Sequence, residues 1–256
     1  MRVSDLAIAF GLGIAVSLGT APRFLQSEPP AIPKISEFAP SGDLVEQVDF
    51  FVGRIEQTLA DPADFDLAKQ SRAFKDGNTL AALALILAYS NQEHPLKASM
   101  PRLLKGAQAL AAAEDNVVRA QAALAEIHAA RAGSTDPLAT VKWERVASLG
   151  ALMKQVPLIH AGLKRGVEGN RLARQAVQSA GQSAALAAIA QASMLDSEYV
   201  KRPADIEKWQ RLCAQMRDAA GEVNSAVHAQ DPQRVTAGMK RLAQSCDACH
   251  AVFRSE

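Results

Sequence analysis

The stretch ADIEKWQRLCAQMRDAAGEVNSAVHA, residues 204–229, decides the fold because its apolar residues follow a strict heptad spacing. Steps that alternate between three and four residues place side chains on one stripe of an α-helix, and such a stripe is buried against neighbouring helices. We therefore predict a long helix over about 204–229 that packs into a bundle. Its inner seam consists of Ile206, Trp209, Cys213, Met216, Ala220, Val223 and Val227.

A second helix of the same kind is predicted immediately after it. Asp231 followed by Pro232 has the form of an N-cap residue and a proline at the first helical position. The inner seam of this last helix consists of Val235, Met239, Leu242, Cys246, Cys249 and Phe253. Two of the three cysteines of the chain therefore occupy core positions of the last helix.

The composition of the whole chain agrees with a helical protein. Ala, Leu, Gln, Glu, Lys and Arg dominate, aromatic residues make up only 5%, and β-branched residues are sparse, which favours helices over strands. We predict an all-α fold. The net charge is +1 and the basic residues are dispersed among acidic ones, so the sequence lacks the basic patch of a nucleic-acid-binding protein.

The N-terminal 43 residues have the pattern of an export segment followed by a linker. Arg2 precedes an apolar run from Leu6 to Leu18, which is short for a membrane-spanning helix. We expect residues 1–25 to be a signal peptide or an uncleaved membrane anchor, and residues 26–43, rich in proline, to be an extended tether. The folded part would then lie in the periplasm or another extracytoplasmic compartment.

Helical spacing continues through the rest of the chain, in two groups separated by the turn sequence GSTDP at 133–137. The first group is a bundle-like domain at 44–132, with helices over about 44–59, 64–90, from Pro95 onward, and over 115–131. The second, at 133–256, is an antiparallel four-helix bundle with helices over about 137–164 and 170–195 before the two described above. Similar stretches at 78–88 and 183–193 raise the hypothesis of a duplicated bundle.

The residues Cys246-Asp247-Ala248-Cys249-His250 form a C-x-x-C-H motif, the attachment signature of c-type haem. Thiols at positions i and i+3 lie on one helix face and can each form a thioether with a haem vinyl group, while the histidine presents its imidazole to the iron. A zinc site would need further ligands at comparable spacing. A redox C-x-x-C follows a strand, and a disulfide across i and i+3 of one helix is strained. We therefore expect one covalent haem c. The 44–132 domain has no cysteine and is expected to be free of haem.

With this motif near the C-terminus, residues 137–256 resemble cytochrome c′ and its methionine-ligated relatives, which are four-helix bundles. The resemblance rests on PLATVKWERVASLGALM, on RPADIEKW and on CDACHAVFR, and covers a little under half of the chain. It implies that His250 is the proximal iron ligand. It also implies that Arg145 lies near a haem propionate and that Arg254 stands close to the proximal imidazole. A solvated helix charge is the alternative for both arginines.

The resemblance leaves the opposite, distal side of the iron open. An apolar residue four places after the first-helix arginine covers the iron in cytochrome c′, and here that residue is Leu149, which favours five-coordinate iron. Met153 lies one turn further along the same stripe and could ligate the iron if Pro157 kinks the helix. His160 is a second-choice ligand that lies far along the helix.

These expectations add up to a monohaem c-type cytochrome that transfers one electron to a redox partner protein. The alternative is a five-coordinate haem protein that binds NO or CO as a sensor or scavenger. An enzyme such as a peroxidase is disfavoured, because no distal His/Arg pair is evident. The 44–132 domain could extend the bundle, dock a partner or pair two subunits in a homodimer.

Overall fold

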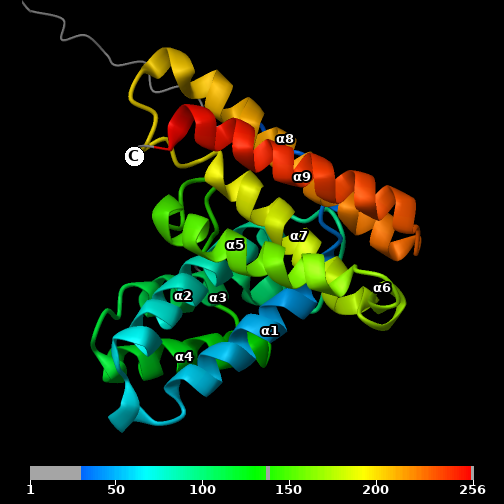
Figure 1. Cartoon of the computed structure of the whole chain (residues 1–256). Helices are drawn as coiled ribbons and strands as arrows, with labels where there is room; N and C mark the ends of the chain where they lie inside the picture. The colour runs from blue at the N-terminus through cyan, green and yellow to red at the C-terminus, as the bar shows by residue number, and fades with distance from the viewer. Residues whose placement is uncertain (1–29, 137–138, 255–256) are drawn as a thin grey trace, which may run out of the picture.

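The computed structural model describes residues 30–136 and 139–254, and in these ranges the fold is built from helices without any strand (Figure 1). The all-α expectation is therefore confirmed. No helix of this part of the chain is both long and apolar enough to cross a membrane. The expected signal or anchor segment at 1–25 lies outside the described residues.

The N-terminal helices are α1 (Ser41–Leu59), α2 (Leu67–Ala88), α3 (Met100–Ala111) and α4 (Val117–Arg131). They pack on one another, each consecutive pair in contact and α4 also in contact with α1. Asp66 and Asn116 cap α2 and α4 by accepting a hydrogen bond from a backbone N–H three residues on. The expected start of the third helix at Pro95 is wrong by five residues, because a turn and a short 3₁₀ segment (Lys97–Ser99) precede α3.

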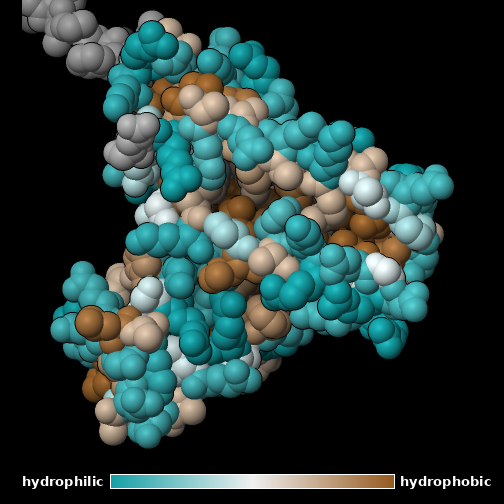
Figure 2. All heavy atoms as spheres, in the orientation of Figure 1, coloured by the Kyte–Doolittle hydropathy of each residue, from teal (hydrophilic) through white to brown (hydrophobic). Residues whose placement is uncertain are grey.

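The C-terminal helices are α5 (Leu149–Gly166), the short α6 (Arg171–Arg174), α7 (Ala176–Ser193), α8 (Ile206–His228) and α9 (Pro232–Phe253). The α8 and α9 bounds agree with the sequence prediction, whereas the helix expected over 170–195 is divided into α6 and α7. Helix α7 packs on both α5 and α8, and α9 packs on α8. Figure 2 shows apolar side chains gathered in the hollow between the α8–α9 pair and α5.

The helix that we expected over 137–164 begins only at Leu149. The prediction is therefore wrong for residues 139–148. Residues 139–148 are irregular because side chains of α2 hold them. The Trp143 ring packs edge to face on Tyr89 at 5.0 Å, and the Tyr89 hydroxyl donates to the Val141 carbonyl at 2.8 Å. The amide oxygen of Asn78 accepts from the Ser148 backbone N–H at 2.7 Å. These long-range contacts outweigh the local helix propensity.

Helices α2 and α7 lie at the centre of the molecule. Each contains a run of completely buried residues, at 80–87 and 184–190, and the two helices pack on each other and on α1 and α5. Small residues permit this packing, since alanine lets helix axes approach closely. One hydrophobic core therefore includes residues of both the α1–α4 and the α5–α9 segment. The two similar stretches found in the sequence are these two central helices.

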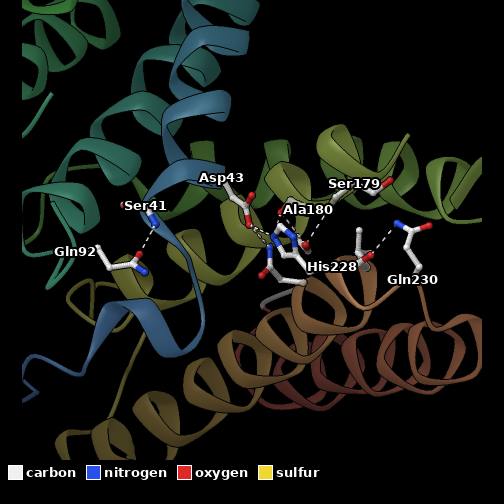
Figure 3. A network of polar contacts seen from close by, with 10 residues as sticks. Ser41, Asp43, Gln92, Ser179, Ala180, His228 and Gln230 are labelled. Carbon is white, nitrogen blue, oxygen red and sulfur yellow. Dashed lines mark hydrogen bonds and ion pairs between the residues drawn. The ribbon is translucent and has the colours of Figure 1, made fainter. Parts of the chain in front are cut away.

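A polar contact joins the two segments beside this core (Figure 3). The Asp43 carboxylate, at the start of α1, accepts a hydrogen bond from the Asn224 side chain at 2.7 Å and lies 2.8 Å from Nε2 of His228. Asn224 also donates to the Ala180 carbonyl of α7 at 2.9 Å. One buried amide of α8 thus satisfies groups of α1 and α7.

The proline-rich segment is folded from Ile35 onward, which corrects the expectation of an extended tether up to residue 43. Ile35, Phe38 and Ala39 are buried. The Phe38 backbone approaches α8 so closely that a Cβ atom on Gly221 would stand 2.9 Å from the Phe38 Cα, and the Arg217 guanidinium lies over the Phe38 ring at 5.1 Å. Burial of these apolar side chains stabilises the folded conformation of the segment, which its proline content did not predict.

Candidate haem site

Helix α9 begins where its cap sequence predicts. The Asp231 carboxylate accepts hydrogen bonds from the backbone N–H groups of Gln233 and Arg234, each at 3.0 Å. Close packing on α8 is possible at Gly238, where a Cβ atom would stand 2.9 Å from the Val223 side chain. Val235 and Leu242 of the inner seam are buried there. The cap and the close contact fix the register of the C-x-x-C-H motif one turn beyond Leu242.

The second half of the α9 seam is only partly covered. Cys246 and Cys249 are half-buried, and His250 is exposed. The Phe253 ring packs edge to face on the buried Trp209 of α8 at 5.3 Å. This partly exposed half of the seam lines a cavity.

That cavity has a volume of about 490 Å³ and lies between α5 and α9, within the usual size of ligand sites. Its walls bring together four of the sequence-predicted residues, Leu149, Met153, Cys249 and His250, and Arg254 stands at its end. The other lining residues are Gly150, Lys154, Pro157, Tyr199, Trp209 and Phe253.

A smaller cavity of about 50 Å³ adjoins it and contains the rest of the motif. Cys246 lines this smaller space together with Cys249, His250 and Met153, and Cys213 of α8 forms part of its far wall. Both thiols of the motif and its imidazole therefore face one apolar space. Met153 of α5 lines both cavities together with His250 of α9.

The thiols are kept protonated by their surroundings. Burial, with a smaller contribution from Cys246, raises the pKa of Cys249 to about 11. Burial likewise raises the pKa of Cys246. The pKa of Cys213 is raised well above its ordinary value, mainly by burial and further by the nearby Cys249. Cys213 is the only one of the three that is fully buried, which makes it an unreactive thiol, whereas Cys246 and Cys249 are half-buried.

The first turn of α5 lines the cavity, and a buried carboxylate holds the start of this helix. The sequence did not predict this contact. Asp196, only 2% exposed, follows α7 and accepts a hydrogen bond from the Leu149 backbone N–H at 3.1 Å. It replaces the missing side-chain cap of α5. The position of Leu149, 5% exposed, is thereby fixed.

Arg145 forms an ion pair with this carboxylate and does not line the cavity. Its Nε lies 3.1 Å from Asp196 and its guanidinium 2.8 Å from Glu198, and it is not among the residues that line either cavity. Because α5 begins at Leu149, Arg145 does not lie one helical turn before Leu149 as the count from sequence assumed.

Sequence reasoning did not single out Asp196, Tyr199 or Lys154. Tyr199 lines the cavity and its hydroxyl lies over the first turn of α5, 3.3 Å from where a Gly150 Cβ would stand. Asp196 and Tyr199 follow α7 in a loop, where no periodicity points to a partner. His160 lines neither of the two cavities beside the motif.

The residues fit a c-type haem. Two thiols and an imidazole share the open face of one helix, and the space before them is apolar and lies between two helices, as cofactor sites in bundles do. Within the described ranges, no group of three or more His, Cys, Asp or Glu residues is arranged to hold a metal ion on its own.

Comparison with known proteins gives one match. Residues 203–254 match the family model described as Cytochrome C′, which spans the start of α8 to the end of α9 and includes the whole C-x-x-C-H motif. No curated protein and no solved structure matches the chain. The α8–α9 segment is thus similar to the Cytochrome C′ family, and this similarity implies a haem cofactor.

Proposed function

We propose that the protein is a monohaem c-type cytochrome that transfers one electron in an extracytoplasmic compartment. The observation that carries this proposal is the placement of the C-x-x-C-H residues on the walls of two apolar cavities that share lining residues: Cys249 and His250 line both, and Cys246 lines the smaller one. The N-terminal export pattern supports the compartment, because covalent haem attachment takes place outside the cytoplasm.

Each part of the site has a role in this proposal. Cys246 and Cys249 would hold the haem by thioether bonds, and His250 would bind the iron. The haem, when bound, supplies a one-electron redox centre. Leu149, Trp209 and Phe253 would contribute apolar atoms around it, which exclude water and favour the iron state of lower charge.

Met153 is our choice for the distal ligand. It lines both cavities together with Cys249 and His250, whereas Leu149 lines only the larger one. The argument for Leu149 also depended on a helical count from Arg145 that the start of α5 removes. A thioether ligand from Met153, together with His250, would raise the reduction potential of the iron, as methionine ligation does in electron-transferring cytochromes.

Binding of NO or CO to five-coordinate iron is the second candidate. The specific observation in its favour is the fixed position of Leu149, whose backbone N–H is held by Asp196. An apolar side chain held over the distal face would leave room only for a small neutral ligand.

Visible spectra of the oxidised and reduced protein, with and without CO, test the proposal. We expect low-spin spectra that do not respond to CO. Met153→Ala should give high-spin ferrous iron that takes up CO, since it removes the sixth ligand. Met239→Ala is the matched control, because Met239 is also partly buried but lines a different cavity. High-spin, CO-binding iron in the unaltered protein would contradict electron transfer through six-coordinate iron and favour the gas-binding candidate.

A further inference from the structure

Three polar side chains from three different segments line the larger cavity. They are Lys154 of α5, Arg254 directly after α9, and Tyr199 from the loop between α7 and α8, and we call them the rim residues. The remaining titratable groups on the lining are Cys249 and His250 of the motif, and α8 contributes only Trp209. The lining of the cavity thus combines apolar side chains with the hydrogen-bond donors of the rim residues, and no carboxylate lines it.

Neither cation among the rim residues has a carboxylate partner. In the described part of the chain, the ion pairs with Asp or Glu include neither Lys154 nor Arg254. Arg145 differs, because it pairs with both Asp196 and Glu198. Moving Arg145 away would leave the buried Asp196 carboxylate without its counter-charge, which is costly.

The orientation of a haem bound at the motif follows from its chemistry. The two vinyl groups and the two propionates lie on opposite edges of the macrocycle. Both cysteines line the smaller inner cavity, whereas Cys246 is absent from the lining of the larger one. Thioether formation therefore places the vinyl edge at the inner cavity and directs the propionate edge toward the rim residues.

We propose that Lys154, Arg254 and Tyr199 form a carboxylate-binding rim that holds the haem propionates, and that Arg145 does not take part. This inference rests on the proposed function. A lysine and an arginine together neutralise two carboxylates, and charge-assisted hydrogen bonds to them are stronger than neutral ones. The arginine that the family resemblance assigned to a propionate serves instead to balance Asp196 at the start of α5.

Resonance Raman spectra of the haem-loaded protein test the rim, because the propionate bending mode reports hydrogen bonding to these groups. We expect this mode to shift in Lys154→Met and in Arg254→Met, together with a lower reduction potential, because an uncompensated propionate charge favours ferric iron. Lys154→Arg should keep the mode near that of the unaltered protein. Lys164→Met is the matched control on the same helix, ten residues further on and outside the cavity, and should leave the mode unchanged.

The inference is overturned if the propionate mode stays unchanged in both Lys154→Met and Arg254→Met while the haem is fully attached. It is also overturned if Arg145→Met alone shifts the mode. Failure of the proposed function can be told apart from failure of this inference, because a protein that carries no covalent haem would show no haem bands in any variant.

Discussion

His160 is the described residue whose protonation should couple most clearly to stability away from the haem site. It lines a separate cavity of about 680 Å³ with Lys164 at the other end of α5, and its Nε2 is buried without a hydrogen-bond partner in the described part of the chain. Burial lowers the pKa of His160, and the charge of Lys164 lowers it further.

The unfolded chain should therefore bind a proton near pH 6.5 that the folded protein resists. The free energy of unfolding then decreases as the pH falls from about 7 through the lowered pKa of His160. We expect His160→Leu to remove this part of the pH dependence, measured by urea unfolding at a series of pH values. Parallel pH profiles for His160→Leu and the unaltered protein would contradict the assignment.

Single residues of the site were predictable from sequence to different degrees. Cys246, Cys249 and His250 were found because their spacing is local and specific. Lys154 follows Met153 in the sequence but lies outside the predicted stripe and has no signal of its own. Asp196 could not be found, because the N–H group that it caps belongs to Leu149, 47 residues away in the sequence.

Among the elements, α5 decides the distal side of the site. Its start depends on Asp196, which caps the Leu149 N–H and pairs with Arg145. The sequence placed this start twelve residues too early, because Asp136 and Pro137 have the form of a cap. Local propensity favoured a helix there, while Trp143 and Ser148 are held by α2 through contacts that no sequence period indicates.

We expect Asp196→Ala to lower the free energy of unfolding by about 1–3 kcal/mol, because it leaves a buried N–H group without its acceptor. Asp196→Asn keeps an acceptor and should lose less. Glu198→Ala, which removes an exposed partner of the same arginine, should have a small effect. The measurement is chemical denaturation followed by circular dichroism, and equal stability of Asp196→Ala and the unaltered protein would contradict the capping role.

At the scale of the whole molecule, the α1–α4 segment is joined to the α5–α9 segment, which contains the C-x-x-C-H motif, by a continuous core. Helices α1 and α2 pack on α7, and α2 also packs on α5, while Asn224 and His228 bind Asp43. Periodicity and cap residues predicted the helical class and, almost to the residue, the bounds of the last two helices. They did not predict the contact between the two segments, because amphipathic periodicity shows that a helix face is buried but not which helix covers it.

The shared core predicts cooperative unfolding of the described helices. Thermal unfolding of the haem-loaded protein should give coincident transitions in the far-ultraviolet dichroism of all helices and in the Soret absorption of the haem. Two separate transitions, with helical signal lost before the haem band changes, would show that the α1–α4 segment unfolds independently.

The central claim, covalent haem on Cys246 and Cys249, is tested most directly by the intact mass of the denatured protein produced in a host that attaches c-type haem. The predicted result is the mass of the chain plus one haem, retained in Cys213→Ala and lost in the double variant Cys246→Ala/Cys249→Ala. A chain without added mass, or a haem that stays attached in the double variant, would contradict the account.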